Sequence, residues 1–511
     1  MNFAERTLRR LLGVNPVAWA GYARRMRRRF REFEGDLPAN PTGQRILAVV
    51  TPWDKTGVPW LTIAIGLMLG ARGARVTFIV DDVPFGPRPM IYGTVLRAIR
   101  AVMRDVARRF EVLHLSQIEP LEGSEAPATI DRLSKLNAVW ELRGERAMAG
   151  RAEVEARNRR ALDAAYGRIA RILASYEFDA LFTAGGIYGN SGIWVDRARA
   201  RGLRIISFDN SGFGTWMIAV DGLACHLDDV PRAVRIFEDE LDHAGREQAL
   251  TVARGEVAKR QKSTDTVKYQ VAAASGDERG AAGAMMLALN SSWDAAALGI
   301  HELFHSNQQW IVETVRHLLD TTEAPVIVRQ HPAERFDFAK TTDDYGALLA
   351  EHFGSHPRLR FIAAADPVNS YALMKQVAAV IVHSSTIGSE AAAMGRPVIT
   401  ASRSYYAGLG FVWQASTLVQ YHQYLTDAVE GRLEVSEAMR EKALLCYYTA
   451  QICNWVRSTC NPEAFKTWSL RPLRHWYDEA TTVRALDAMI SGIPVAVLNH
   501  RARAADAAGG A

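Results

Sequence analysis

The sequence predicts an α/β protein built from two Rossmann-like, doubly wound domains. From Arg45 onward, short apolar runs alternate with longer helix-like segments. A polar stretch rich in small residues, 263–283, interrupts this alternation, which resumes at about Gly283. Strands that alternate with helices form parallel βαβ units, so the two stretches predict two parallel sheets with helices on their faces.

The composition is that of a globular protein. The chain has 511 residues, long for one core, with 48% hydrophobic and 23% charged residues. Its net charge of +5 is local, because residues 1–31 hold nine Arg and one acid; we expect no nucleic-acid partner. Four cysteines without a CxxC pair indicate a reducing compartment. With no apolar run of ~18 residues and no signal-peptide pattern, a cytoplasmic protein is expected.

Residues 1–40 are predicted to form a basic, amphipathic helical segment. Large apolar side chains recur three or four positions apart, at Trp19, Tyr22, Met26, Phe30 and Phe33, and Arg fills much of the remainder. Two interpretations are open. Residues 1–35 lie on an anionic membrane at its inner face with the apolar side down, or the helix docks on protein with its basic side in solvent.

The first domain is predicted over 41–282, including the linker. Strands are expected at 45–50, 74–82, 178–186 and 203–212, because each is a short apolar run bounded by turn residues. Helices are expected at 60–73 and 192–202, and a charged helix-like stretch covers 230–262.

The second domain is predicted over 283–475. Strands are expected at 284–292, 324–332, 359–364, 378–385 and 396–401, and helices at 301–319 and 369–377. A further helix should begin near Ser385 or Thr386, because Gly395 and Pro397 mark its end. The remainder, 476–511, is predicted as an extension with a disordered small-residue tail at 501–511.

Polar residues follow three strands of the second domain, where ligands bind in open α/β sheets. They are Asn290, Ser291 and Ser292, then Arg329 to Pro332, then His383 to Thr386. Together they predict one site at the carboxyl edge of the sheet.

Arg329 and His331 are two positions apart on a predicted strand, so their side chains leave it on the same side. Pro332 holds His331 in an extended conformation. A guanidinium and an imidazole aimed at one point form a receptor for phosphate oxygens. The alternative is structural, with Arg329 in an ion pair and His331 capping the strand end.

The run before the helix at 386–394 supplies a second receptor for an anion. The first turn of a helix offers unpaired N–H groups and the positive end of its dipole, and the hydroxyls of Ser385 and Thr386 can add donors. Simple capping by either residue is the alternative. Glu390 does not fit a capping box; it accepts hydrogen bonds from ribose hydroxyls, or it is a favourable charge near the helix start. With no convincing DxD or His-rich cluster, we expect no metal and no cofactor apart from the nucleotide-sugar substrate.

The segments "VIVRQHPAE" and "HSSTIGSEAAAMGRPVI" resemble the bacterial capsule polysaccharide synthesis family, which includes Kdo transferases. They are also similar to the His-Pro and Ser-Ser/Thr motifs of bacterial sialyltransferases, which use CMP-sugars. The resemblance implies a GT-B glycosyltransferase, with two Rossmann-like domains facing a cleft. It implies that His331 contacts the donor phosphate, that Ser384, Ser385 and Thr386 bind it, and that Glu390 holds the ribose. A loop at 402–411 is similar to one in the capsule family and is expected near the donor.

The first domain should provide the acceptor site and a general base. "SFDNSG" lies at a strand end where sialyltransferases place an acidic pair, which favours Asp209 as the base, although Asn210 replaces the second acid. Asp54 and Asp82, also at strand ends, are alternatives, and each of the three Asp could instead cap a turn. A glycine-rich loop at 183–192 would let backbone approach a sugar.

The sequence therefore predicts a metal-independent, inverting glycosyltransferase. It would move a sugar from a nucleotide donor, CMP-linked by preference and with CMP-Kdo as the example, to a cell-surface polysaccharide or glycolipid. Two alternatives stay open: a nucleotide-sugar epimerase or hydrolase on the same fold, and a non-catalytic, membrane-associated component of polysaccharide assembly.

Overall fold

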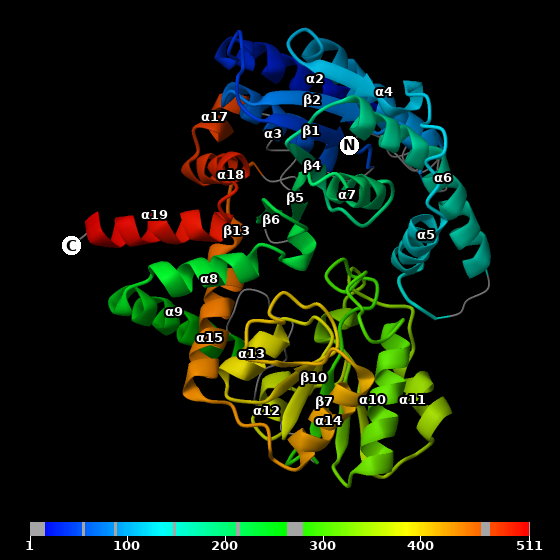
Figure 1. Ribbon diagram of the computed structural model, residues 1–511, viewed down its shortest axis with the longest axis vertical. Helices are drawn as coiled ribbons and strands as arrows, with labels where there is room; N and C mark the ends of the chain where they lie inside the picture. The colour runs from blue at the N-terminus through cyan, green and yellow to red at the C-terminus, as the bar shows by residue number, and fades with distance from the viewer. Residues whose placement is uncertain are drawn as a thin grey trace. The chain divides into compact units, whose positions relative to one another are not determined.

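The computed structural model describes residues 16–53, 57–85, 89–146, 150–210, 215–262, 280–460 and 471–509. The chain divides into two compact units. Unit 1 comprises 1–138, 150–229 and 453–511, and unit 2 comprises 139–149 and 230–452. Each unit contains its own sheet, as predicted for two Rossmann-like domains (Figure 1).

Unit 1 is built on a seven-stranded sheet in the order β13-β6-β5-β4-β1-β2-β3. The five strands β5, β4, β1, β2 and β3 are parallel to one another. At the other edge, β6 pairs antiparallel with β5, and β13 pairs antiparallel with β6. The strands are β1 (Arg45–Val50), β2 (Arg75–Val80), β3 (Glu111–His114), β4 (Ala180–Ala184), β5 (Arg204–Asn210), β6 (Trp216–Ala219) and β13 (Trp455–Val456).

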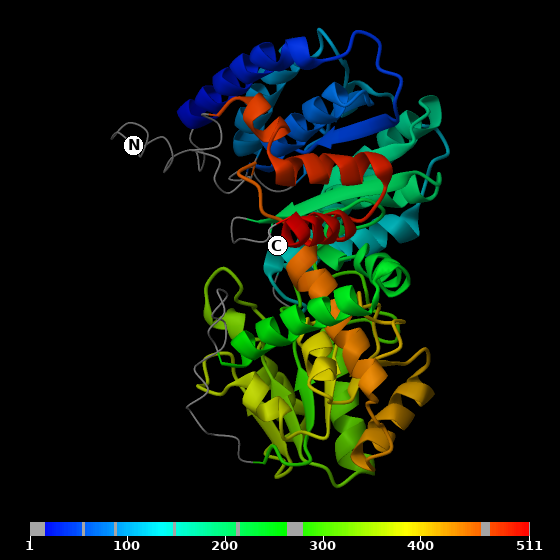
Figure 2. The same ribbon diagram turned by 90° about the vertical axis from the view of Figure 1, so that its left-hand side faces the viewer.

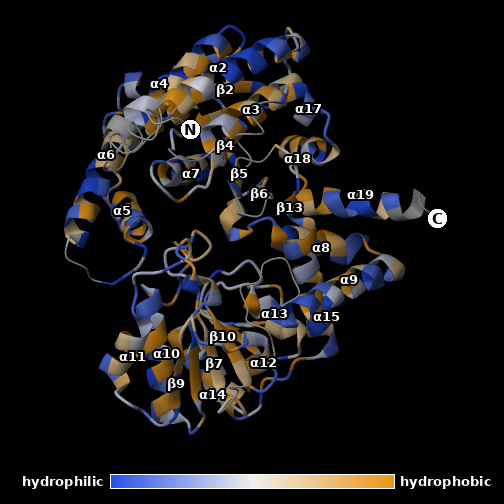
Figure 3. Cartoon of the chain, turned by 180° about the vertical axis from the view of Figure 1, so that it is seen from behind, coloured by the Kyte–Doolittle hydropathy of each residue, from blue (hydrophilic) through white to orange (hydrophobic). Residues whose placement is uncertain are grey.

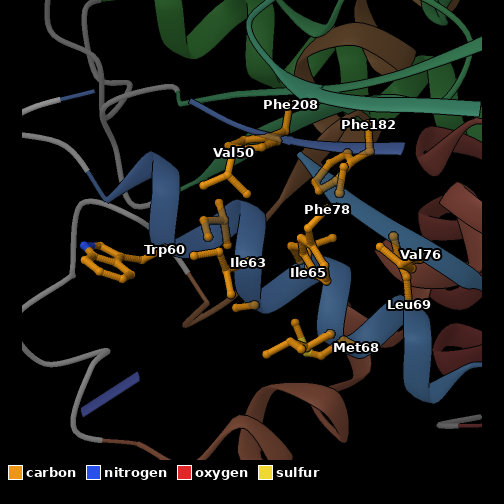
Figure 4. Close-up of a cluster of buried hydrophobic side chains, with 14 of the residues drawn as sticks. Val50, Trp60, Ile63, Ile65, Met68, Leu69, Val76, Phe78, Phe182 and Phe208 are labelled. Atoms are coloured by element: carbon orange, nitrogen blue, oxygen red, sulfur yellow. The ribbon is translucent and has the colours of Figure 1, made fainter. Parts of the chain in front are cut away.

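Helices cover the sheet of unit 1, and its apolar core lies between them and the strands. In Figure 4, Ile63 of α3 lies beside Val50 of β1 and Ile65 of α3 beside Phe78 of β2, and Trp60 and Met68 belong to the same cluster. The helices are α2 (Pro16–Phe33), α3 (Val58–Ala71), α4 (Pro89–Val106), α5 (Pro127–Leu142), α6 (Arg151–Ser175), α7 (Ser191–Arg199), α17 (Leu473–Tyr477), α18 (Ala480–Ser491) and α19 (Val495–Gly509). The last turn of α5, from residue 139, belongs to unit 2.

Unit 2 has a six-stranded sheet in the order β12-β11-β10-β7-β8-β9, and all of its strand pairs are parallel. Read from β9, this is the 3-2-1-4-5-6 order of the Rossmann fold. The central strands are fully buried, which explains why they read as continuous apolar runs and appear orange in Figure 3. The strands are β7 (Met285–Ala288), β8 (Val326–Arg329), β9 (Leu359–Ile362), β10 (Ala379–Val382), β11 (Val398–Thr400) and β12 (Trp413–Gln414).

The helices of unit 2 surround this sheet. They are α8 (Val230–Glu240), α9 (His243–Gln261), α10 (Asn307–Thr321), α11 (Tyr345–Phe353), α12 (Ser370–Met374), α13 (Ile387–Ala393), α14 (Leu418–Val429) and α15 (Glu437–Tyr447). Far apart in sequence, α9 and α15 lie side by side in Figures 1 and 2. The last turns before 453 are π-helical.

The boundaries of the units differ from the predicted domains. The charged stretch at 230–262 forms α8 and α9, and both belong to unit 2 rather than to the first domain. After 452 the chain returns to unit 1, where β13 pairs with β6 and α17 and α18 contact α2 and α3. The predicted tail at 501–511 is helical as far as Gly509, because its alanines favour a helix.

The apolar side of the N-terminal helix α2 is covered by protein, which overturns the interpretation that this side lies on a membrane. Met26, Phe30 and Phe33 are at most 1% exposed and belong to the core of unit 1, and the helix packs on α4. Arg27 of α2 pairs with Asp105 of α4 at 2.9 Å, which adds an ion pair to this helix contact. The apolar side is therefore not available for insertion into a membrane, and α2 is a docking helix.

Candidate functional site

A pocket opens at the carboxyl ends of the central strands of unit 2. The strand order reverses between β7 and β10, and ligands of doubly wound sheets bind at this switch point. The pocket is lined by Arg260, Ala288, Leu289, Arg329, Gln330, His331, Pro332, Ser370, Tyr371, Ser385, Thr386, Ile387 and Glu390. The structure thus brings together five predicted site residues: Arg329, His331, Ser385, Thr386 and Glu390.

The start of α13 gives this pocket hydrogen-bond donors. The helix begins at Ile387, with Thr386 at the N-cap, one residue after the predicted start. Among the residues that the structure describes, no acceptor bonds the hydroxyls of Ser385 and Thr386 or the backbone N–H groups of Ser385, Thr386 and Ile387. These groups can therefore receive an anionic ligand without breaking an existing bond.

The loop at 402–411 forms hydrogen bonds to the residues at the start of α13. The Tyr406 hydroxyl donates to the Ser385 carbonyl oxygen at 2.7 Å, and the Tyr405 hydroxyl lies 3.3 Å from that of Ser389. Both tyrosines are buried. The loop lies beside the segment predicted to bind phosphate, and its tyrosines support that segment rather than line the pocket.

His331 is held in one orientation and one tautomer. Its backbone is extended, as expected before Pro332, and its Nδ1 accepts a hydrogen bond from the Ala333 N–H at 3.2 Å. Burial and the nearby charge of Arg329 lower its pKa to about 4. At neutral pH the ring is therefore uncharged and carries its proton on Nε2, so it is a hydrogen-bond donor rather than a cation.

Arg329 lines the pocket, but its guanidinium is engaged in the fold. Nη2 donates to the Val368 carbonyl oxygen at 3.0 Å, Nη1 to that of Ala363, and Nε to the Ser370 hydroxyl at 3.3 Å. Burial lowers its pKa to about 10, so it keeps its charge at neutral pH. Arg329 anchors the loop after β9 and contributes positive charge from the pocket wall. These bonds go to carbonyl and hydroxyl oxygens rather than to the carboxylate of the ion pair that the structural alternative predicts.

Glu390 belongs to a buried cluster that the sequence did not indicate. Its Oε1 accepts from Arg260 Nη1 at 2.5 Å, and its Oε2 accepts from the Tyr371 hydroxyl at 2.7 Å. Arg260 also donates to Gln451 Oε1 at 3.2 Å and lies over the ring of Tyr447. Burial opposes the charge of Arg260, but the attraction of Glu390 raises its pKa above the ordinary value. Arg260 thus brings a permanent cation to the pocket from α9.

Three predicted ligand-binding residues do not line the pocket. The Ser384 hydroxyl donates to the Ala296 carbonyl oxygen at 2.8 Å and accepts from Asn290 Nδ2 at 3.1 Å. The Ser291 hydroxyl donates to the Ala339 carbonyl oxygen at 3.3 Å. These bonds hold the loops behind the site together, and the predicted contacts of Ser384, Asn290 and Ser291 with the donor stay predictions. Side chains at a strand end alternate in direction, which turns Ser384 away from its neighbour.

His383 also contacts protein groups behind the site. Its Nε2 lies 3.0 Å from His301 Nδ1, and the two rings are 4.2 Å apart. His301 in turn lies 3.8 Å from Glu145, whose carboxylate accepts from the first N–H groups of α10. These contacts give His383 a structural role.

The candidate bases lie in unit 1. Asp209 is a half-buried residue of β5, opposite Met217 of β6, as expected for a strand end. Asp82 is buried and bonded to Arg100 at 2.6 Å, His114 at 3.2 Å and the Ser116 N–H at 2.6 Å. Although burial opposes the charge, these bonds hold the pKa of Asp82 well below its usual range, which makes it a structural anion and a poor base. Asp54 lies outside the described residues.

The glycine-rich loop after β4 has backbone conformations that favour glycine. Gly185, Gly186 and Gly189 all have positive φ, and the Gly189 N–H donates to Asn137 Oδ1 at 2.7 Å.

Within the described parts of the chain, no three His, Cys, Asp or Glu side chains are grouped to hold a metal ion. None of the helices in those parts is long and apolar enough to cross a membrane.

Comparison with known proteins identifies one family over part of the chain. Residues 242–451, about two fifths of the sequence and all within unit 2, match the model of the family described as capsule polysaccharide biosynthesis proteins. The resemblance inferred from the two sequence motifs is confirmed over this segment, and the predicted class, a glycosyltransferase of capsule synthesis, agrees with it. No curated protein matches the sequence.

Several solved structures are distantly similar. The beta Kdo 2,4 transferase of Thermosulfurimonas dismutans KpsC is 14% identical, covers 57% of this chain and 87% of its own, and has a TM-score of 0.37. The beta Kdo 2,7 transferase of the same protein is 15% identical, with coverages of 59% and 88% and a TM-score of 0.34. A UDP complex of S. aureus MnaA is 11% identical, with coverages of 88% and 97% and a TM-score of 0.27. With TM-scores below 0.5, these likenesses establish no property of this chain.

Proposed function

We propose that this chain, whose residues 242–451 match the capsule polysaccharide biosynthesis family, is a GT-B glycosyltransferase of surface polysaccharide synthesis. It transfers a sugar from a nucleotide donor, CMP-linked by preference, to a glycan or glycolipid acceptor, without a metal and with inversion. The observation that carries this proposal is the pocket at the switch point of unit 2, where N–H and O–H donors and two cationic side chains surround one space.

The donor phosphate binds at the start of α13. The N–H and O–H groups of Ser385 and Thr386 supply donors, and the helix dipole adds partial positive charge. His331 donates from Nε2, and its neutral state fits a leaving group that already carries negative charge. Two arginines that line the pocket, Arg329 and Arg260, supply positive charge, and the carboxylate of Glu390 offsets part of the charge of Arg260. Fixed donors and cations of this kind stabilise the charge that develops on a departing phosphate.

The nucleoside occupies the side of the pocket near Tyr371 and Glu390. The carboxylate of Glu390 already accepts one bond at each oxygen, from Arg260 and from Tyr371. Each carboxylate oxygen can accept a second bond, so ribose hydroxyls can donate to it. Arg260 and Tyr371 orient this carboxylate before the ligand arrives.

In the transfer step, an acceptor hydroxyl attacks the anomeric carbon of the donor sugar. The new carbon–oxygen bond forms while the bond from that carbon to the phosphate oxygen breaks, and the nucleotide leaves as an anion. The proton of the acceptor hydroxyl passes to a general base of unit 1, for which Asp209 is the candidate. The preference for CMP follows the likeness of the two motifs to bacterial sialyltransferases.

The protein works at the inner face of a membrane, where a lipid-linked acceptor is available. Since the apolar side of α2 is buried, contact with anionic lipids would depend on the exposed arginines of this helix alone. Such binding is electrostatic, so ~0.5 M salt should release the protein from anionic vesicles.

A turnover assay with CMP-sugars tests the proposal. We expect His331→Ala to lower transfer by on the order of a hundredfold, the scale for losing one fixed donor to a developing charge. Asp209→Asn should abolish transfer while nucleotide binding persists. Conversion of the donor in the absence of acceptor at the full rate would instead indicate an epimerase or hydrolase, and no turnover with no nucleotide binding would indicate a non-catalytic component.

A further inference from the structure

An exposed pair of aromatic rings lies on the turn that follows the pocket-lining residue Pro332. Phe338 is 59% exposed and Phe336 is 37% exposed, and both belong to the few large apolar side chains at the surface of the described residues. Their rings are nearly parallel, with centroids 5.7 Å apart and planes inclined by 10°. The two rings form one flat apolar surface on an otherwise polar turn. We call Phe336, Phe338 and the side chains around them the ring-pair surface.

The turn that carries these rings is rigidly held. The Phe336 N–H donates to the Ala333 carbonyl oxygen at 2.9 Å, and the Ala339 N–H donates to that of Phe336 at 3.0 Å. Arg143 Nη1 donates to the Asp337 carbonyl oxygen at 2.8 Å. An apolar surface that is exposed and yet fixed by hydrogen bonds is pre-organised for a ligand, because little conformational entropy remains to be lost on binding.

The surroundings of the ring pair are basic. The Arg335 guanidinium lies 4.7 Å from the ring centroid of Phe336, and that of Arg143 lies 4.8 Å from the ring centroid of Trp293. The exposed charged side chains of 143–146 and 335–340 are Arg143, Arg146, Arg335 and Lys340, against one acid, Asp337. Guanidinium groups beside a flat apolar surface fit a ligand that combines carboxylates with apolar faces.

Sugar rings of an acidic polysaccharide have both properties. The C–H groups on one face of a pyranose are apolar and pack on an aromatic ring, while a carboxylate at the edge pairs with arginine. The 3-10 turn Pro332–Arg335 connects the pocket to the ring pair, and four residues at ~2.0 Å each place Phe336 about 8 Å along its axis from Pro332. A glycan that reaches the donor sugar from this side would pass over the rings.

We propose that the ring-pair surface is a subsite for the growing acidic glycan that accepts the donor sugar. Phe336 and Phe338 stack on its sugar rings, and Arg335 and Arg143 pair with its carboxylates. This assignment rests on the proposed function, and it names the chemical class of the acceptor and the residues that select it.

Binding of defined oligosaccharides to the whole protein tests the subsite. The probes are two acidic hexasaccharides, an oligogalacturonate and an oligosialic acid, and neutral maltohexaose, measured by titration calorimetry. We expect at least one acidic probe to bind, maltohexaose to bind more weakly, and Phe338→Ala to weaken acidic binding on the order of tenfold. Phe338→Trp should retain it, and Arg335→Gln should weaken it and reduce its salt dependence. Val419→Ala is the matched control, because Val419 is an exposed apolar residue of α14, 81% exposed.

The outcomes separate this inference from the proposed function. If a nucleotide raises the melting temperature but neither acidic probe binds, or Phe338→Ala binds them as the wild type does, the subsite is wrong and the donor pocket stands. If acidic glycan binds in a Phe338-dependent way and no nucleotide binds, the glycosyltransferase proposal fails. Loss of nucleotide affinity in Phe338→Ala would assign the rings to the nucleobase, and a changed oligomeric state in sedimentation would assign them to a contact between copies; either result overturns the subsite.

Discussion

Replacing Arg260 by Met should destabilise unit 2 strongly, because it removes the cation that pairs with a buried carboxylate. Glu390 is 2% exposed at its side chain and Arg260 is 22% exposed, and their charged atoms are 2.5 Å apart. Removing one partner of a buried ion pair typically costs ~3–5 kcal/mol, since the remaining charge stays desolvated. The partial exposure of Arg260 places the expected cost near the lower end, about 3 kcal/mol.

The assay is thermal unfolding followed by circular dichroism, with urea unfolding as a second measurement. For a unit of this size, ~3 kcal/mol corresponds to a fall in melting temperature of roughly 6–12 °C. The double variant Arg260→Met with Glu390→Gln should recover much of the loss, because the neutral amide no longer requires a cation. Arg316→Met is the matched control: its pair with Glu313 is 2.9 Å long, but both side chains are more than 40% exposed, so it should cost under ~1 kcal/mol. Equal effects of Arg260→Met and Arg316→Met would refute the view that the pair is a buried anchor of the pocket.

Three further predictions concern individual residues of the pocket and of α2. The pKa of His331 is about 4 in the folded protein instead of 6.5, so as the pH falls the unfolded chain binds this proton before the folded chain does. The free energy of unfolding should therefore fall between pH 6.5 and pH 4, by ~2 kcal/mol at pH 5. Urea unfolding of His331→Gln at pH 7.5 and pH 5 should lack this loss of stability. Thr386→Val should leave the free energy of unfolding within ~0.5 kcal/mol of the wild type but weaken nucleotide binding several-fold, whereas Ser384→Ala should cost ~1–2 kcal/mol with little effect on binding; the reverse pattern in calorimetry would contradict the division of roles along this strand end. Phe30→Ala should destabilise unit 1 by ~3–5 kcal/mol and leave vesicle binding unchanged. Reduced vesicle binding without a loss of stability would instead support the interpretation that the apolar side of α2 inserts into a membrane.

The parallel sheets could be predicted from the sequence because local patterns determine them. Buried parallel strands read as continuous apolar runs, and β7, β8 and β10 were each expected within a few residues of their bounds. The start of α13 followed from its Gly and Pro stop signals. The polar strand ends of unit 2 then predicted the position of the pocket, since the switch point of a doubly wound sheet is a property of topology.

The roles of the individual pocket residues depend on contacts between distant parts of the chain, which no local sequence pattern predicts. Arg260 lies 130 residues before Glu390 in the sequence, and only the packing of α9 on unit 2 brings them together. Ser384 and Ser385 are adjacent and chemically identical, and the direction of each side chain at the strand end decides which one faces the pocket. The conformation of His331 could be predicted from Pro332, but its neutral state depends on burial and on Arg329.

The ends of the units were also beyond local reasoning. The amphipathic pattern of α2 identifies an apolar side but does not say whether lipid or protein covers it. The return of the chain to unit 1 after 452 depends on β13, only two residues long, whose pairing with β6 leaves no periodic signal in the sequence.

The most direct test of the central claim is nucleotide binding at the switch point of unit 2. Melting temperatures of the wild type and of His331→Ala should be measured with CMP, UDP, GDP and dTDP. A nucleotide at a hundred times its dissociation constant stabilises the folded state by ~2.7 kcal/mol, so we predict a rise of roughly 5–10 °C for the cognate nucleotide, largest for CMP and much smaller in His331→Ala. No rise with any of the four nucleotides, or an equal rise in the variant, would contradict the assignment of this pocket to the donor.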